Sequence, residues 1–145
     1  MKKRKICIVG AGIFGCTFAL NLDKNKYDVD LFDKENDILK GVSGKNQQRF
    51  HLGFHYPRSK KTILEIKKAY KDFINFFGKS FFGNTKNFYG ISKVESKINF
   101  KNYINLLKKN KLKYKVVKNN LFSNLEGLII TNEKNLNIDK FRTSL

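Results

Sequence analysis

Short apolar runs alternate with small or polar breaks in the first quarter of the chain. Residues 6–9 are continuously apolar, residues 10–15 contain three glycines, and Val29, Leu31 and Asp33 stand at alternate positions. An apolar run of this length bounded by glycine is typical of a buried strand. The pattern from residue 13 indicates a short helix, with a turn at residues 25–28. We therefore predict a strand, a tight turn, a helix and a second strand, which is the βαβ start of an α/β fold.

Gly10, Gly12 and Gly15 have the spacing of a dinucleotide-binding turn. In such a turn the first glycine allows the sharp bend, the second lets the backbone approach a pyrophosphate, and the third lets the helix pack closely on the sheet. Free N–H groups at the helix start offer an anion site. Asp33 lies 18 residues after Gly15, where an acid binds adenosine ribose hydroxyls. These positions predict a dinucleotide site.

Residues 38–53 leave this apolar pattern and are rich in glycine, hydroxyl and amide side chains. Such a composition predicts a loop. Two interpretations stay open: a loop that faces solvent, or a loop that folds back over a bound cofactor.

The segment 50–59 concentrates groups that can do chemistry. They are His51, His55, Tyr56 and Arg58, in a chain with only two histidines. The histidines have a helical metal spacing, but Gly53 and Pro57 argue against a helix and no third ligand is evident, so we predict no metal site. Alternation would instead place both imidazoles on one face of an extended segment. They are candidates for catalysis or for polar groups that hold a loop.

Periodicity predicts the remaining elements. An apolar stripe at 3,4 spacing follows a Ser59 cap and predicts a helix to about Phe77, ended by Gly78. Strands are expected at residues 88–94, 114–117 and 127–131, and helices at about 99–110 and after Asn137.

Composition narrows the class of partner. The formal net charge is +18, but only four of the 30 basic residues are arginine and the lysines are spread along the chain. Because base and phosphate recognition favours arginine, we expect no specific nucleic-acid partner. Two cysteines give neither a disulfide framework nor a metal spacing, so a reducing cytoplasmic location is expected. No apolar run is long enough to span a membrane, and no membrane partner is expected.

Three segments together resemble the N-terminal part of the FAD-dependent oxidoreductases related to D-amino-acid oxidase and glycine oxidase. They are residues 8–15, 31–34 and 43–46. Residues 46–59 are similar to a subgroup of that family associated with surface-polysaccharide pathways. The resemblance implies a Rossmann-like FAD-binding domain, begun by the βαβ unit, with part of an α+β substrate domain.

The same resemblance implies FAD as cofactor and assigns residues to it. The expected cofactor-binding residues are Gly10, Gly12, Ile13, Phe14, Gly15, Asp33, Lys34, Ser43, Gly44, Asn46 and Gln47. The glycines would face the pyrophosphate, Asp33 the ribose, and the 43–46 loop the pyrophosphate and ribityl chain. Most relatives have glutamate in place of Asp33, and many have glycine in place of Gln48.

The resemblance also implies a division of the chain and a reaction. We expect residues 1–77 to form the FAD-binding half with its following loop and helix, 78–136 a partial substrate domain, and 137–145 the start of a helix that returns to the FAD domain. The expected function is the N-terminal fragment of an oxidoreductase that oxidises a C–N or C–O bond of a small anionic substrate by hydride transfer to flavin. The fragment would be inactive alone, and the remainder of its own chain would complete the fold.

Within that reaction, His51 and His55 are candidates to take a proton, and Tyr56 and Arg58 to contact substrate or flavin. An arginine would bind a carboxylate or phosphate through two hydrogen bonds. Alternatives are a flavin-dependent nucleotide-sugar mutase resembling UDP-galactopyranose mutase, an NAD-dependent dehydrogenase, and a non-catalytic dinucleotide-binding module.

Overall fold

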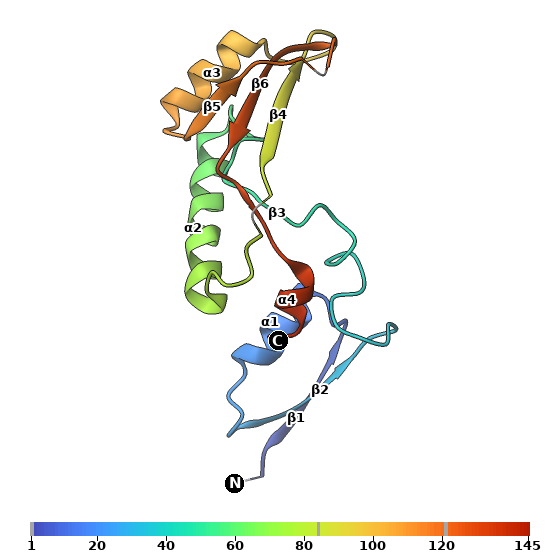
Figure 1. Cartoon of the computed structure of the whole chain (residues 1–145). Helices are drawn as coiled ribbons and strands as arrows, with labels where there is room; N and C mark the ends of the chain where they lie inside the picture. Colours follow the sequence, from blue (N-terminus) through green and yellow to red (C-terminus); the bar gives the residue numbers. More distant parts are fainter. Residues whose placement is uncertain (1, 84, 121) are drawn as a thin grey trace. The chain divides into compact units, whose positions relative to one another are not determined.

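The chain groups into two compact units. The computed structural model describes residues 2–83, 85–120 and 122–145 (Figure 1). Unit 1 comprises Met1–Gln48 and Asn137–Leu145, and unit 2 comprises Arg49–Leu136. The helix at residues 60–77 thus groups with unit 2. The division into an FAD-binding part and a substrate domain stays a prediction.

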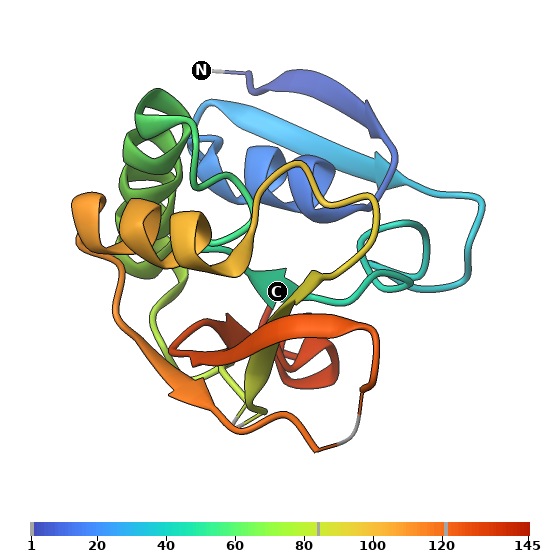
Figure 2. The same cartoon turned by 90° about the horizontal axis from the view of Figure 1, so that it is seen from above.

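Unit 1 contains the predicted strand–turn–helix–strand. Strand β1 (Arg4–Val9) leads through the glycine turn to helix α1 (Ile13–Asn21) and then to β2 (Tyr27–Phe32). The two strands pair in parallel, with Ile6 opposite Val29. Helix α1 lies beside both strands (Figures 1 and 2). Asp33 follows directly after β2, at the carboxyl end of the parallel pair. The expected βαβ start of a Rossmann-like fold is therefore confirmed.

The end of the chain contributes a short helix to unit 1. Helix α4 (Ile138–Arg142) begins at Asn137, whose side chain accepts a hydrogen bond from the Lys140 N–H. Phe141 is fully buried, and the Arg142 guanidinium pairs with Asp37 at 3.3 Å. This ion pair connects α4 to the segment after β2.

Unit 2 combines two helices with a three-stranded antiparallel sheet. Helix α2 (Lys60–Phe77) begins at the predicted Ser59 cap and ends at Gly78, where φ is +82°. The sheet has the order β4 (Asn87–Ser92), β6 (Leu125–Thr131) and β5 (Tyr114–Val117), and α3 (Phe100–Lys109) connects β4 to β5 along the chain. The core consists of Phe54, Ile63, Tyr103, Leu107, Leu112 and Ile129.

Two two-residue strands were not predicted. Strand β3 (Arg49–Phe50) pairs antiparallel with β7 (Lys134–Asn135). Two residues carry no recognisable period, so only their tertiary partner defines them.

The expectation of an extended segment at residues 51–55 is wrong. Gly53 has φ of +104°, and the Tyr56 N–H donates to the Gly53 carbonyl at 3.0 Å, so the chain turns there. A Cβ on Gly53 would lie 2.8 Å from Ile63, so a larger residue would also disturb the core. In the part of the chain that the structure describes, no helix is long and apolar enough to cross a membrane.

Candidate functional site

The glycine turn of unit 1 has a geometry that larger residues cannot adopt. Gly10 has φ of +106°, in the left-handed region, and its N–H donates to the Phe32 carbonyl at 2.7 Å. A Cβ on Gly15 would lie only 1.9 Å from the Gly10 carbonyl oxygen. The turn is thus folded directly against the start of α1, and two of its glycines are required by backbone geometry.

Asp33 fastens this turn to the end of β2. Its Oδ2 accepts a hydrogen bond from the Ala11 N–H at 2.5 Å, and its Oδ1 accepts one from the Glu35 N–H at 2.9 Å. These hydrogen bonds hold the pKa of the exposed Asp33 carboxyl below its usual value, and the one from Glu35 has a larger effect than the one from Ala11. Asp33 is therefore an ionised acceptor at neutral pH.

A groove lies beside this carboxylate. It has a volume of about 420 Å³, and its lining includes Ala11, Phe32, Asp33 and Asp37. Asp33 stands at the carboxyl end of a parallel strand, where ligands of open α/β sheets bind. The groove and the carboxylate together offer a place for a group with vicinal hydroxyls.

Ser43 reaches the first turn of α1. Its Oγ accepts a hydrogen bond from the Ile13 N–H at 3.1 Å, while Gly12, the cap residue, offers no side chain. A Cβ on Gly12 would lie 3.2 Å from this oxygen. Ser43 thus occupies the Ile13 N–H, and the other N–H groups of the first turn of α1, beside glycine backbone, suit an anion. The structure brings together Gly10, Gly12, Ile13, Gly15, Asp33 and Ser43.

The loop at residues 41–48 is fixed by its own hydrogen bonds. The Asn46 amide donates to the Val42 carbonyl at 3.1 Å, and its oxygen accepts from the Gln48 N–H at 2.6 Å. The Gln48 amide donates to the Gly44 carbonyl at 2.7 Å, so this side chain helps to hold the loop. A Cβ on Gly44 would lie 2.2 Å from the Leu39 carbonyl oxygen. The loop is preformed beside the turn.

The other expected cofactor residues are solvent-facing. Phe14 is 88% exposed, and Lys34 and Gln47 are exposed as well. Lys34 follows Asp33 directly in the sequence. The role of these three residues in cofactor binding stays a prediction.

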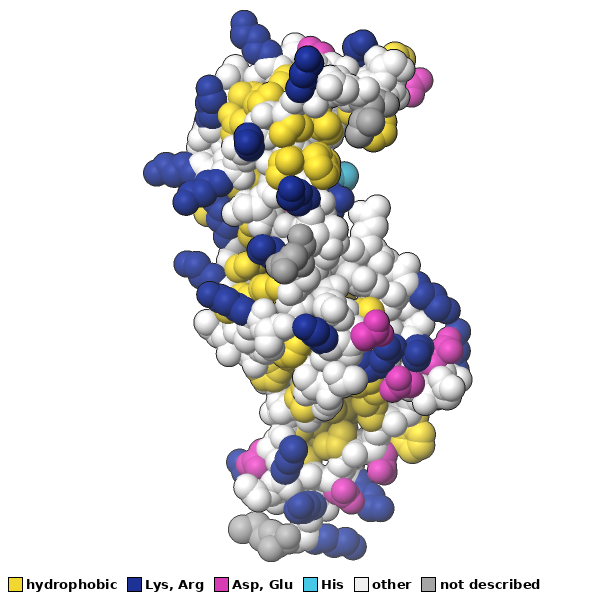
Figure 3. Space-filling model, viewed as in Figure 1, with side chains coloured by type: hydrophobic (Ala, Val, Ile, Leu, Met, Phe, Trp, Pro, Cys, Tyr) yellow, Lys and Arg dark blue, Asp and Glu magenta, His cyan; other side chains and the backbone are white. Residues whose placement is uncertain are grey.

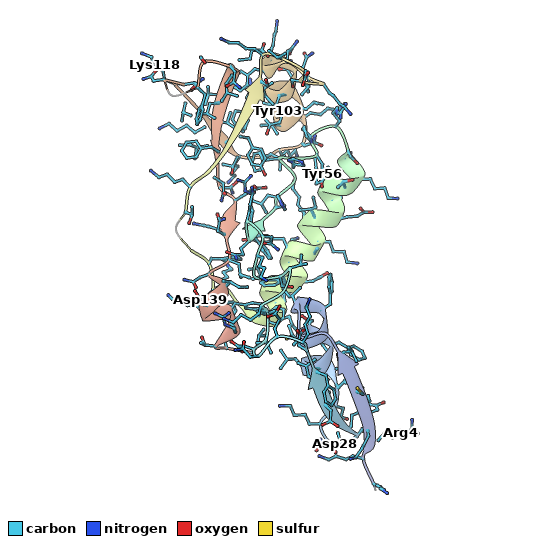
Figure 4. All side chains as sticks on the ribbon, turned by 90° about the vertical axis from the view of Figure 1, so that its right-hand side faces the viewer. Arg4, Asp28, Tyr56, Tyr103, Lys118 and Asp139 are labelled. Atoms are coloured by element: carbon cyan, nitrogen blue, oxygen red, sulfur yellow. The ribbon has the colours of Figure 1, made fainter. Side chains whose placement is uncertain are left out.

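Three of the four predicted catalytic residues lie close together in unit 2. The ring centroids of His51 and His55 are 6.5 Å apart, and those of His55 and Tyr56 are 5.1 Å apart. Arg58 lies in the same loop and is exposed. Figure 4 labels Tyr56 in the loop that leads into α2. The described residues contain no cluster of three or more histidine, cysteine or acidic side chains that could hold a metal ion.

Glu133 organises this segment, and sequence reasoning did not find it. The residue is 1% exposed, and its carboxylate accepts hydrogen bonds from the Leu52 N–H at 2.6 Å and the Tyr89 hydroxyl at 2.7 Å. His51 Nδ1 lies 3.9 Å from the same carboxylate. Glu133 is 81 positions from Leu52 along the chain. No local pattern marks such a partner; the one signal in the sequence is an acid two residues after the predicted strand at residues 127–131.

Further groups surround the buried carboxylate. The Arg49 guanidinium lies 5.0 Å above the Tyr89 ring, and the Asn87 amide donates to the Glu133 carbonyl at 2.9 Å. Burial, and then the hydrogen bond to Glu133, raises the pKa of the Tyr89 hydroxyl well above its usual value. The tyrosine therefore remains a proton donor to Glu133 at every physiological pH.

The residues of unit 1 fit a dinucleotide cofactor. The glycine backbone at the start of α1 lacks the Cβ atoms that would keep a pyrophosphate away. At Gly15 the adjacent Gly10 carbonyl leaves no room for a Cβ atom. The ionised Asp33 at the end of β2 supplies the acceptor that ribose hydroxyls need. The fit rests on the geometry of the turn and on the charge of Asp33.

Comparison with known proteins identifies the cofactor. The model of a family described as FAD dependent oxidoreductase matches residues 5–93, more than half of the chain. The FAD-dependent monooxygenase kojA of Aspergillus flavus is 46% identical over 65 residues, which cover 45% of this chain and 15% of that protein. An FAD-dependent monooxygenase of Fusarium mangiferae is 36% identical over 70 residues, covering 48% and 19%.

A more distant similarity is also found. The glycerol 3-phosphate dehydrogenase of Caloramator mitchellensis is 37% identical over 49 residues, covering 34% of this chain and 10% of that protein. The matched parts therefore span less than a fifth of these relatives. The turn, the acid after β2 and the family match lead to one conclusion: the chain belongs to the FAD-dependent oxidoreductase family, and its cofactor is FAD.

Proposed function

We propose that this protein oxidises a C–N or C–O bond of a small anionic substrate, with hydride transfer to FAD. The observation that carries the proposal is the preformed turn at residues 10–15, joined by Asp33 and Ser43. When bound, FAD supplies a two-electron acceptor for the hydride. The residues of this chain bind the cofactor, orient the substrate and take up the proton that leaves its amine or hydroxyl.

We assign the cofactor contacts to unit 1. Gly10, Gly12 and Gly15 would face the pyrophosphate, with the N–H groups of the first turn of α1 other than that of Ile13 as donors. Asp33 would accept hydrogen bonds from the adenosine ribose, supported by its ionised state and the groove beside it. A further set would cover the pyrophosphate and ribityl chain or flank the ribose: Ile13, Phe14, Lys34, Ser43, Gly44, Asn46 and Gln47.

We assign substrate contacts to the loop of unit 2. A neutral imidazole takes up a proton near pH 7, so His51 or His55 would receive the proton of the substrate amine or hydroxyl. Arg58 would bind the substrate anion through its guanidinium. Tyr56 would flank the same position. The support is the short spacing of the His51, His55 and Tyr56 rings on a loop that Glu133 fixes.

We further propose that additional chain completes the FAD site. Strands β1 and β2 pair only with each other among the described residues. Val9, Phe14 and Phe32 are 85%, 88% and 56% exposed. Two strands do not make the sheet that holds a dinucleotide, so 145 residues alone would bind flavin weakly and would not turn over. A cytoplasmic location belongs to the same proposal and is supported by the free thiols of Cys7 and Cys16.

A second candidate is monooxygenation. It is favoured by the Aspergillus and Fusarium relatives, which are described as FAD-dependent monooxygenases and match this chain at 46% and 36% identity. An oxidase or dehydrogenase reduces flavin with the substrate alone, whereas a monooxygenase needs a separate reductant and incorporates oxygen into the product. Anaerobic mixing of the flavin-loaded full-length protein with candidate substrates distinguishes the two.

The test of the proposal measures flavin reduction with amino acids and hydroxy acids in the full-length gene product. We expect His51→Ala and Arg58→Ala to slow reduction while flavin stays bound, and Lys60→Ala, an exposed change next to the loop, to leave it unchanged. Equal turnover in all three variants refutes the assigned substrate roles. Isomerisation of a nucleotide sugar under reducing conditions, without net flavin reduction, would instead favour a mutase.

A further inference from the structure

A small pocket opens in unit 2, between the loop after β3 and strand β4. Its volume is about 230 Å³, below the size of a typical cofactor or drug site. Its lining includes Phe54, His55, Arg58, Tyr89, Lys97 and Tyr103. The wall thus combines aromatic rings with basic side chains, and no acidic residue is among the described residues that line it.

The backbone that carries His55 and Arg58 is held in place from α3. The Tyr103 hydroxyl donates to the Phe54 carbonyl at 3.1 Å, and the Asn110 amide donates to the Pro57 carbonyl at 3.0 Å. Phe54 and Tyr103 are 1% and 2% exposed. Figure 4 labels Tyr103 on α3, within unit 2. The loop therefore presents its basic side chains from a fixed position.

The two tyrosine hydroxyls of the pocket lining already donate hydrogen bonds within the protein, so the other polar groups of the lining define which ligand fits. Tyr89 donates its hydroxyl to Glu133 at 2.7 Å, and Tyr103 donates its own to Phe54. The polar groups that remain in the lining are basic: the imidazole of His55, the guanidinium of Arg58 and the ammonium of Lys97. Among the described residues, neither Arg58 nor Lys97 forms an ion pair. A pocket with two unpaired cations over aromatic walls suits an anion that carries an apolar body.

We propose that this pocket binds a small organic anion, with its carboxylate or phosphate held by Arg58 and Lys97 and its apolar part against Phe54 and Tyr89. Lys97 lies in the segment before α3, and no sequence motif marked it as a ligand-binding residue. The inference deepens the proposed function by giving the anionic substrate an apolar body and a second cationic contact, Lys97, and it rests on that function only in taking the bound anion to be the substrate. Binding itself requires no flavin.

Ligand-observed NMR titration of the full-length protein tests the pocket. The probes are phenylacetate, phenyl phosphate and the neutral phenylacetamide, with acetate as an anion that lacks the apolar body. We expect saturable binding of phenylacetate or phenyl phosphate, the tighter of the two identifying carboxylate or phosphate as the natural group. We expect at least tenfold weaker binding of phenylacetamide and of acetate, because each lacks one half of the recognition.

Variants decide which residues carry the binding. Arg58→Gln and Lys97→Gln should each weaken the preferred anion about tenfold, whereas Lys101→Gln, an exposed lysine of α3 outside the pocket lining, should leave it unchanged. Both substituted side chains are exposed, and unchanged thermal unfolding checks that the fold is intact. The proposal is refuted if phenylacetamide binds as tightly as the preferred anion, or if Lys101→Gln weakens that anion as much as Arg58→Gln and Lys97→Gln do.

The outcomes separate the pocket from the proposed function. Anion binding that depends on Arg58 and Lys97, with no flavin reduction by any such anion, supports the pocket and refutes the oxidation. Flavin reduction by an anion whose binding is unchanged in both variants supports the oxidation and overturns the pocket.

Discussion

Replacement of Gly15 by alanine tests the geometry of the glycine turn directly. A Cβ at this position would have to move from 1.9 Å to at least 3.0 Å from the Gly10 carbonyl oxygen, a displacement of about 1.1 Å. The obstacle is backbone, so α1 must shift away from the turn. Forced overpacking of this kind costs about 3 kcal/mol, and alanine returns about 1 kcal/mol through its helix propensity. We expect a net loss of about 2 kcal/mol in the free energy of unfolding.

Gly41 supplies the matched control in the same unit. A Cβ there meets nothing within 4 Å, and its φ lies outside the left-handed region. Gly41→Ala should therefore stabilise the chain by about 0.4–1 kcal/mol, because alanine restricts the unfolded state. The two glycine-to-alanine changes are expected to have opposite signs.

The assay is urea unfolding followed by far-UV circular dichroism at 25 °C, with flavin retention of the full-length product as the functional readout. Gly15→Ala should lose flavin, since the displaced α1 no longer presents its N–H groups to the pyrophosphate, and Gly41→Ala should keep it. Wild-type stability and wild-type flavin content in Gly15→Ala would refute the reasoning.

Two further predictions concern the buried Glu133 cluster. Glu133→Ala removes the acceptor of the Leu52 N–H and the Tyr89 hydroxyl, so it should lower the free energy of unfolding by about 2–4 kcal/mol. Glu133→Gln should lower it less, and Glu65→Ala, on the exposed face of α2, should not change it measurably. Equal stability of all three variants would contradict the account. Burial raises the pKa of Tyr89 and Tyr103 above the ordinary value of 10.0. Their contribution to stability is fully present below pH 10 and is lost as the pH rises further. Phenolate absorbance above pH 10 should accordingly be lower in the folded chain than in urea, and Tyr89→Phe or Tyr103→Phe should reduce that difference; identical absorbance in both states would show that the hydroxyls are not protected.

The elements that sequence reasoning predicted well are those with local signals. Helix α2 has an apolar stripe, a Ser59 cap and a Gly78 stop within one stretch, and all three are found. The glycine turn and Asp33 are separated in sequence, but a fixed spacing relates them, and the structure joins them through the Ala11 N–H. Local period and fixed spacing are properties that one sequence displays.

What sequence reasoning missed depends on distant partners. Glu133 meets Leu52 across 81 positions and Tyr89 across 44 positions. Strands β3 and β7 have two residues each and exist only through their pairing. The alternation at residues 51–55 indicated an extended segment, but the positive φ of Gly53 turns the chain instead. Tertiary contacts decide such positions, and no local pattern reports them.

The lysines are dispersed along the sequence rather than gathered in one basic block. On the face shown in Figure 3, the Lys and Arg side chains are scattered among other groups. The absence of a specific nucleic-acid partner nevertheless remains a prediction, and a filter-binding assay at physiological salt measures it.

The visible absorption spectrum of the full-length gene product, recorded as purified and after mixing with FAD or NAD, tests the central claim most directly. The turn at residues 10–15, the ionised Asp33 and the Ser43 hydroxyl at the start of α1 predict a yellow protein with flavin absorbance at one flavin per chain, lost in Gly15→Ala and kept in Gly41→Ala. A colourless protein that binds NAD and does not bind FAD would contradict the account.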